Sequence, residues 1–112
     1  MAKTKSKTSV KEKDGISLEL DELKRAALAL RAINHKVRQQ IMDLIHKNGE
    51  ITVSEIYGKL KMEQSLTSSY LAILRRAGVV KTRREGQSIH YSINYDHIAQ
   101  IEKGAKMINS MR

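Results

Sequence analysis

Apolar residues recur every three or four positions from about residue 17 onward, which predicts a first amphipathic helix with Ser17 as its N-cap. The recurring residues are Leu20, Leu23, Ala27, Leu30 and Ile33. Three further residues, Leu18, Ala26 and Leu28, make this helix apolar on more than one face. A helix with that much apolar surface is expected to pack both on its own core and on a second copy of the chain.

A second helix is predicted to begin at Asn34 or His35 and to end at Asn48-Gly49, because Gly favours the position just after a helix. Its apolar residues at core spacing are Val37, Ile41, Leu44 and Ile45. His46, near the end of this helix, suits the negative end of the helix dipole. The pattern therefore predicts a helix with one side facing the core.

A third, short helix has the clearest start in the chain. Thr52 and Glu55 form a capping-box pattern, in which each side chain satisfies a free backbone N–H group of the other residue. Ile51 before the cap and Ile56 after it are placed to form a hydrophobic staple. This helix is expected to end near residues 61–62, only a few residues before the next one. Two short helices joined in this way are typical of a helix-turn-helix.

The fourth helix, predicted over residues 63–78, has two chemically different sides. A core-facing stripe is predicted from Leu66, Ile73, Leu74 and Ala77. The opposite side carries polar groups near the N-terminal end, namely Gln64, Ser65, Thr67, Ser68 and Tyr70. Such a helix fits the major groove of DNA, and an ordinary amphipathic helix with a solvated polar side fits the same pattern.

A basic β-hairpin is predicted directly after this helix. Residues 79–84 and 88–93 have strand character, and residues 85–87 form the turn between them. A helix-turn-helix followed by a basic hairpin is a winged arrangement, in which Arg83 and Arg84 would meet the DNA backbone or minor groove. The expected fold is therefore mainly α with a small β-hairpin, a winged helix-turn-helix.

The last helix is predicted from about Asp96 and has its own apolar stripe. No element remains in sequence order to cover that stripe, and pairing with the first helix across a two-fold axis would bury both. The predicted dimer interface consists of Leu20, Leu23, Ala27, Ile98, Ile101, Ala105 and Ile108. The winged helix-turn-helix is thus expected to be a homodimer.

Composition narrows the class of protein. A chain of 112 residues forms one domain with a modest core. It contains no cysteine, which excludes disulfides, thiolate metal sites and thiol redox switches and is compatible with the cytoplasm. No apolar run approaches the roughly 20 residues of a transmembrane helix, and no signal-peptide pattern is present. We therefore expect a cytoplasmic protein without a membrane partner.

The distribution of charge indicates a polyanionic partner. The formal net charge is +9, and residues 59–91 hold seven basic residues against two acidic ones. The fourth helix and the hairpin are thus the positive part, which favours salt-dependent binding of double-stranded DNA. Residues 1–15 are lysine-rich and without periodicity, so we expect a disordered basic tail before a domain of residues 16–112. That tail either follows DNA phosphates or only keeps the chain soluble.

From about Leu28 to Ile93 the chain resembles the ArsR-type (ArsR/SmtB) family of winged-helix bacterial transcription regulators. Residues 50–56, Glu-Ile-Thr-Val-Ser-Glu-Ile, are similar to the family's Glu-Leu-Cys-Val-Cys-Asp-Leu box with both cysteines replaced. Residues 64–80 follow the recognition-helix pattern, and residues 83–87 with Tyr91 follow the wing. The resemblance implies a homodimer that binds a pseudo-palindromic operator, usually as a repressor released by an effector.

By this resemblance, the recognition helix 63–78 would lie in the major groove and the wing 81–91 on the flanking backbone or minor groove. The implied DNA-contacting residues are Gln64, Ser65, Thr67, Ser68, Ser69, Tyr70, Arg83, Arg84, Gln87 and His90. The family most often has Arg at the position of Ser69 and His at that of Tyr70. Glu63 replaces the usual N-cap Ser, and it keeps the dipole interaction but caps poorly.

Many members of this family are metal sensors, and the residues of both common sites are replaced here. Thr52 and Ser54 occupy the thiolate positions, and neutral hydroxyls do not hold soft metals. In the second, tetrahedral zinc site, His97 alone remains, and the other three positions hold Tyr95, Ile108 and Met111. We therefore expect no metal and no other cofactor, and leave open an unknown effector or partner protein.

The sequence lacks the constellations that enzymes need, such as a nucleophile elbow, a glycine-rich phosphate loop or paired catalytic carboxylates. We expect no enzymatic activity. Two functions remain. One is a sequence-specific DNA-binding regulator, expected to be a repressor. The other is a protein-interaction module, in which the winged helix serves as a scaffold and the terminal helices bind a partner.

Overall fold

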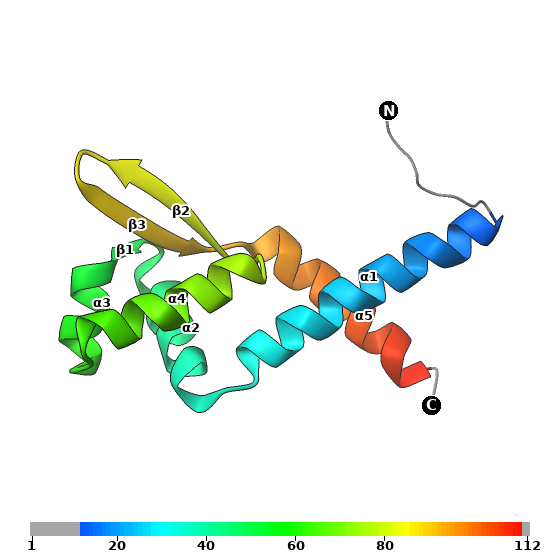
Figure 1. Cartoon of the computed structure of the whole chain (residues 1–112), viewed down its shortest axis with the longest axis horizontal. Coiled ribbons are helices and arrows are strands. Elements are labelled where there is room, and N and C mark those ends of the chain that lie inside the picture. The colour runs from blue at the N-terminus through cyan, green and yellow to red at the C-terminus, as the bar shows by residue number, and fades with distance from the viewer. Residues whose placement is uncertain (1–11, 111–112) are drawn as a thin grey trace.

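The computed structural model describes residues 12–110, which form five helices and three short strands. The elements in chain order are α1 (Glu12–Ile33), α2 (Lys36–Asn48), β1 (Ile51–Thr52), α3 (Val53–Leu60), α4 (Gln64–Arg76), β2 (Val80–Glu85), β3 (Ser88–Ile93) and α5 (Tyr95–Ser110). Figure 1 shows α2, α3, α4 and the strands gathered into a body, from which α1 and α5 extend. This is the winged helix-turn-helix that the sequence pattern predicts.

The core of the body lies where α2, α3, α4 and the base of the hairpin meet. Its fully buried aliphatic side chains are Ile41, Ile45, Ile51, Ile56, Leu71, Leu74 and Val79. They come from five elements or their flanks, so none of these elements buries its apolar side without the others. The core therefore fixes α4 from behind and anchors the hairpin at one end.

Local capping signals set where α3 begins and where α4 ends. The predicted capping box is present: the Thr52 hydroxyl accepts from the Glu55 N–H, and the Glu55 carboxylate accepts from the Thr52 N–H at 3.0 Å. After α4, Gly78 adopts a left-handed φ of +80°. Its N–H donates to the Arg75 carbonyl, and the Val79 N–H donates to the Leu74 carbonyl. This Schellman motif turns the chain from α4 directly into β2.

The wing is part of a three-stranded antiparallel sheet with the order β1-β3-β2. Strands β2 and β3 pair from Val80 opposite Ile93 to Glu85 opposite Ser88, and Gly86 at φ +61° makes the tight turn. The hairpin agrees with the predicted one. The short strand β1, which pairs Ile51 with Tyr91, was not predicted, because two residues beside a helix cap carry no strand pattern.

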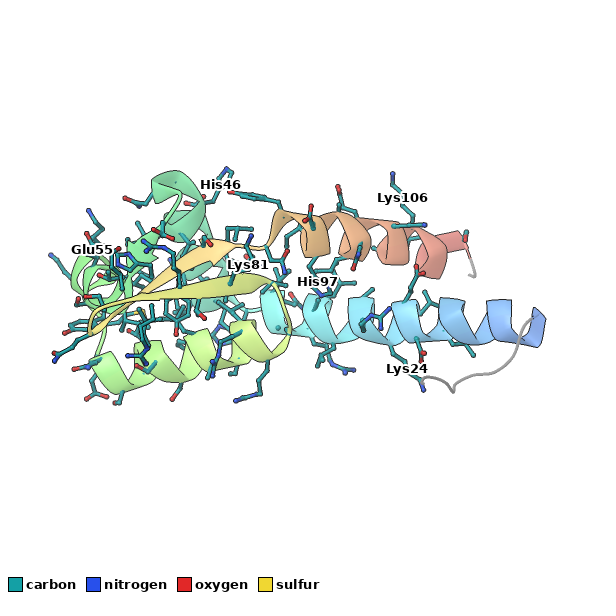
Figure 2. All side chains as sticks on the ribbon, turned by 90° about the horizontal axis from the view of Figure 1, so that it is seen from above. Lys24, His46, Glu55, Lys81, His97 and Lys106 are labelled. Atoms are coloured by element: carbon teal, nitrogen blue, oxygen red, sulfur yellow. The ribbon has the colours of Figure 1, made fainter. Side chains whose placement is uncertain are left out.

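Helices α1 and α5 form a two-helix arm within one chain. They lie side by side in Figure 2 and cross in Figure 1. Small buried residues on α1, namely Ala26, Ala29 and Ala32, allow a close approach. The expectation that α5 has no core partner in its own chain is therefore wrong: Ile101 of α5 is only 5% exposed without any second copy.

The first helix begins earlier than predicted. It starts at Glu12, so that Ser17 lies inside α1 rather than at its N-cap, and residues 12–15 belong to the helix rather than to the tail. Once a helix is nucleated, each added residue gains a hydrogen bond at little cost, which favours extension past a potential cap. Residues 1–11 of the predicted basic tail lie outside the described residues. Within the described part, no helix has the length and apolar character needed to cross a membrane.

Candidate nucleic-acid interface

The outer surface of α4 is polar and exposed. Gln64, Ser65, Ser68 and Ser69 are all exposed, and the opposite side of the helix is held in the core by Leu71 and Leu74. All four side chains are amides or hydroxyls, which donate and accept hydrogen bonds. Because the helix is fixed from behind, these groups stand on a rigid element that fits a major groove.

The buried side of α4 agrees with the predicted stripe at Leu74 and Ala77 but differs from it near the N-terminal end of the helix. Thr67 was expected to face the groove, but it is fully buried, and its hydroxyl donates to the Glu63 carbonyl at 2.9 Å. Leu66 was expected in the core, but it is 45% exposed. The residues that do face the core, Thr67, Leu71 and Leu74, follow the spacing i, i+4, i+7. Thr67 is therefore a core residue, and Leu66 belongs to the outer surface.

The first turn of α4 has weak capping, as predicted. Glu63 occupies the N-cap position but makes no side-chain cap hydrogen bond to the backbone. Its carboxylate instead accepts from the Ser65 hydroxyl at 3.1 Å. The Ser69 hydroxyl donates to the Ser65 carbonyl at 3.0 Å. These exposed hydroxyls are thus partnered inside the helix.

Tyr70 joins α4 to the junction of α1 and α2 rather than standing free in the groove. It is half-buried, and its ring centroid lies 5.1 Å from that of His35. The guanidinium carbon of Arg38 lies 5.7 Å from the same ring. Arg38 also donates from Nε to the Ala32 carbonyl at 2.5 Å, at the end of α1. The ring of Tyr70 therefore has a structural role in packing against His35 and Arg38.

An open hollow separates α4 from the wing. It has a volume of about 330 Å³ and is lined by Thr52, Val53, Ser54, Tyr57, Gln64, Ser68, Gln87, Ser88 and Ile89. Gln87 at the hairpin turn thus shares a surface with Gln64 and Ser68 of α4. Arg84 is the direct cross-strand partner of Ile89, so both stand on one face of the hairpin. The structure therefore brings Gln87 together with the polar side of α4 and places Arg84 on the same hairpin face as Ile89.

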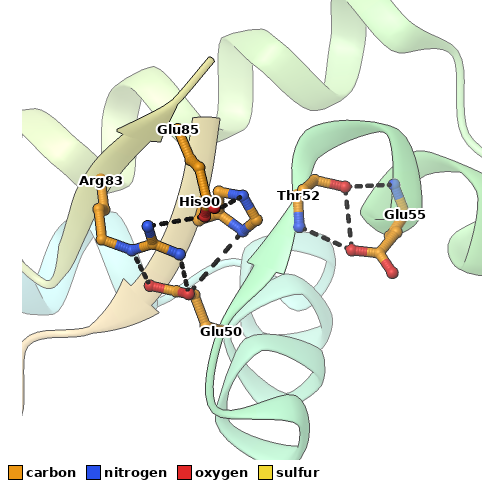
Figure 3. Close-up of polar contacts among 6 residues, drawn as sticks. All are labelled: Glu50, Thr52, Glu55, Arg83, Glu85 and His90. Carbon is orange, nitrogen blue, oxygen red and sulfur yellow. Dashed lines mark hydrogen bonds and ion pairs between the residues drawn. The ribbon is translucent and has the colours of Figure 1, made fainter. Parts of the chain in front are cut away.

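Arg83 stands on the other face of the hairpin and is held by carboxylates (Figure 3). Its Nε and Nη2 donate to the two oxygens of Glu50 at 3.0 and 2.7 Å, and its Nη1 donates to Glu85 at 2.9 Å. The hydrogen bond from Arg83 is the main cause that lowers the pKa of Glu50, and the two carboxylates together raise the pKa of Arg83. His90, the cross-strand partner of Arg83, has ring nitrogens 3.8 Å from Glu50 and 3.9 Å from Glu85. Arg83 and His90 are thus already partnered within the protein.

The positions that resemble metal-site residues serve other purposes. The Thr52 hydroxyl donates to Glu55 at 3.0 Å and lies 3.4 Å from the Ser54 hydroxyl. The Tyr95 hydroxyl lies 2.7 Å from Nδ1 of His46. His97 packs against the turn at Gly78, where an added Cβ would lie 3.2 Å from its ring. Across residues 12–110, no group of three or more His, Cys, Asp or Glu side chains is arranged to hold a metal ion.

The predicted dimer-interface residues fall into two groups. Leu20 is 47% exposed, and Leu23, Ala27 and Ala105 are half-buried. Ile101 is buried, and Ile98 packs partly against the core of its own chain, so these two contribute to packing within one protomer. The side chain of Ile108 lies outside the described residues. Leu28 and Leu30, which the predicted set omits, are exposed on α1.

Comparison with known proteins identifies the family. The family model for the bacterial regulatory proteins of the arsR family matches residues 35–82, from the start of α2 into β2. The transcriptional activator HlyU of Vibrio cholerae is 34% identical over 93 residues, which cover 79% of this chain and 85% of that protein. The chain belongs to the ArsR family. It is accordingly a transcription regulator and not an enzyme.

Solved structures of ArsR-type proteins share the fold. The transcriptional repressor PagR of Bacillus anthracis superposes with a TM-score of 0.65 at 31% identity, covering 74% of this chain and 95% of that one. A homodimeric winged helix-turn-helix DNA-binding domain from Mycobacterium bovis gives a TM-score of 0.64 at 26% identity, covering 92% and 91%. The winged helix-turn-helix architecture is thereby confirmed.

Proposed function

We propose that this ArsR-family protein binds a pseudo-palindromic operator in double-stranded DNA, with α4 in the major groove and the wing on the flanking backbone or minor groove. The observation that carries the proposal is the surface that Gln64 and Ser68 of α4 form with Gln87 of the wing, beside the hairpin face on which Arg84 pairs with Ile89. Amide and hydroxyl groups select bases in the major groove, and a neighbouring guanidinium suits phosphate.

The DNA-binding form is a homodimer in this proposal. Exposed leucines on α1, namely Leu20, Leu28 and Leu30, offer apolar surface on the arm that a second copy would cover. The likeness to the homodimeric domain from Mycobacterium bovis supports the same assembly. A two-fold dimer places its recognition helices on half-sites about one DNA turn, roughly 34 Å, apart. The protein would then act as a repressor by occupying the operator, and the similar protein PagR is named a transcriptional repressor.

Selection from a random duplex pool tests DNA binding directly. Duplexes that the protein retains should contain two half-sites related by two-fold symmetry. Affinity, measured by fluorescence anisotropy, should fall steeply as salt rises, because phosphate contacts release counterions. If no duplex is bound even at low salt, the proposed function is wrong.

Light scattering separates the homodimer from the alternative, in which the arm binds a different protein. A mass of two chains at micromolar concentration is expected for the homodimer. Replacing Leu20 and Leu28 by Glu should shift the mass to one chain and weaken operator binding. Because these leucines are exposed, the folded protomer itself should survive the change. A single-chain mass for the wild type would favour the interaction module.

A further inference from the structure

We propose that the two adjacent wing arginines have different tasks: Arg83 is a positioning residue that fastens the wing across the sheet, and Arg84 is the phosphate-contacting residue. This inference rests on the proposed DNA-binding function and assigns roles within that site. It differs from the expectation that both arginines contact DNA. The residues that hold Arg83 in place are Glu50, Glu85 and its cross-strand neighbour His90.

The Arg83 side chain spans the full width of the sheet. It starts on edge strand β2, passes His90 on the central strand β3, and reaches Glu50, which directly precedes edge strand β1 (Figure 3). The contact with Glu50 consists of two hydrogen bonds, at 3.0 and 2.7 Å. Such a bidentate pair fixes the orientation of the guanidinium as well as attracting it. Glu50 lies just after α2. The Arg83–Glu50 salt bridge therefore connects edge strand β2 of the hairpin to the body of the domain.

The charges around Arg83 argue against a phosphate contact by this residue. One guanidinium faces two carboxylates, so the three side chains of Arg83, Glu50 and Glu85 together carry a net negative charge. A phosphate would have to displace a carboxylate that already accepts two hydrogen bonds from Arg83. That exchange gains little, because one charge-assisted pair replaces another.

Arg84 has the opposite surroundings. Its side chain is exposed and makes no hydrogen bond or ion pair within the described part of the chain. Its cross-strand partner Ile89 lines the hollow that also contains Gln64 and Ser68. Successive residues of a strand face opposite sides of the sheet. Arg84 therefore faces the side of the recognition helix, whereas Arg83 faces the other side. Arg84 is therefore free to pair with a phosphate beside the groove.

The test measures operator affinity of the full chain as a function of salt for single substitutions. Arg84→Ala should reduce the slope of log affinity against log salt by about 1.8, because each protomer of the dimer loses one phosphate contact and each contact contributes about 0.9. Arg83→Ala should weaken binding by roughly three- to tenfold, because the wing must be ordered on binding. Its slope should stay that of the wild type.

For Glu50→Gln, the positioning role of Arg83 and the loss of a negative charge predict opposite changes in operator affinity. Removing an acid near DNA should strengthen binding if only charge matters. If Glu50 acts by holding Arg83, the substitution should weaken binding to a similar extent as Arg83→Ala. Thermal unfolding of each variant shows whether the domain is folded when affinity is measured.

A charge swap provides the decisive comparison. The triple variant Glu50→Arg, Arg83→Glu, Glu85→Gln restores a salt bridge across the sheet with inverted polarity. Its matched control, Glu50→Gln with Arg83→Gln and Glu85→Gln, has the same net charge at these three positions and no such bridge. The swap should bind the operator more tightly than the control if Arg83 positions the wing. Equal affinities in folded variants would overturn the assignment, as would a reduced salt slope for Arg83→Ala. Absence of binding by the wild type would overturn the proposed function as well.

Discussion

Gly104 of α5 lies directly against Ala26 of α1, so closely that a Cβ added at Gly104 would be 2.5 Å from the Cβ of Ala26. Real Cβ atoms do not approach to that distance, and the contacting atom is rigidly attached to helix backbone. The crossing point of the two-helix arm is therefore set by the absence of a side chain at one position. Such close helix crossings depend on small residues, and the alanines of α1 complete the contact.

Gly104→Ala should therefore destabilise the protein although alanine is the better helix former. The helices must separate to admit the methyl group, which costs about 1–3 kcal/mol for an overpacked site. Chemical denaturation measures this as a reduced free energy of unfolding. Gly58→Ala in α3 is the matched control, because an added Cβ there meets nothing within 4 Å. That change should stabilise by up to about 1 kcal/mol.

Thr67→Val should leave DNA binding unchanged, because the Thr67 side chain is buried behind α4. The lost hydroxyl removes one hydrogen bond to the Glu63 carbonyl, which still accepts from the Thr67 N–H at 3.0 Å. The free energy of unfolding should change by no more than about 1 kcal/mol. Ser68→Ala, one residue on but exposed, should weaken operator affinity roughly fivefold. Equal losses for the two variants in an anisotropy titration would contradict this placement.

The order of the helices, the hairpin and the capping box could be predicted because each has a local cause. Periodicity, the Thr52 and Glu55 pair and the glycines at helix ends all act within a few residues. The sides that Leu66 and Thr67 occupy on α4 were predicted wrongly, because Leu66 is the more hydrophobic of the two. Thr67 can be buried since its hydroxyl bonds back to the helix, a contact that a count of apolar residues does not include.

Long-range relationships could not be predicted from pattern alone. The α1–α5 contact joins residues far apart in the sequence, and its decisive residue, Gly104, has no apolar side chain to signal it. The role of Arg83 depends on Glu50, which is remote in sequence and reaches it only through the strand order β1-β3-β2. In the candidate site, the exposed polar residues of α4 were therefore predictable, but the difference between Arg83 and Arg84 was not.

Leu66 should make the protein sensitive to thymine methyl groups. It is 45% exposed beside Ser65 on the outer surface of α4, where an aliphatic side chain can contact the 5-methyl group of thymine in the major groove. Replacing single thymines of the selected operator by uracil should weaken binding roughly fourfold at the contacted position, about 0.8 kcal/mol for one methyl-sized group. In Leu66→Ser the uracil effect should vanish, and a loss that persists there would assign methyl recognition elsewhere.

The contribution of Glu50 to stability should depend on pH in one direction. The hydrogen bond from Arg83, with the charges of Arg83 and His90, lowers the pKa of Glu50 below its ordinary value of 4.5, against a smaller opposing effect of burial. A carboxyl group whose pKa is lower in the folded than in the unfolded state stabilises the folded state at pH values above its unfolded-state pKa. This stabilisation is lost as the pH falls through the folded-state pKa. Stability from Glu50 should thus be fully present at neutral pH and disappear in acid.

Thermal unfolding of the wild type and Glu50→Gln over a series of pH values measures this contribution. The pKa of Glu55 is also lowered, chiefly by the Thr52 N–H, so the wild-type curve alone mixes the two carboxylates. The difference between the two chains isolates Glu50, because both retain Glu55. That difference should be constant near neutral pH and shrink below the ordinary carboxyl range, since protonated glutamate and glutamine are alike in charge. A difference that persists unchanged into strong acid would mean that the Arg83–Glu50 pair adds nothing to folding.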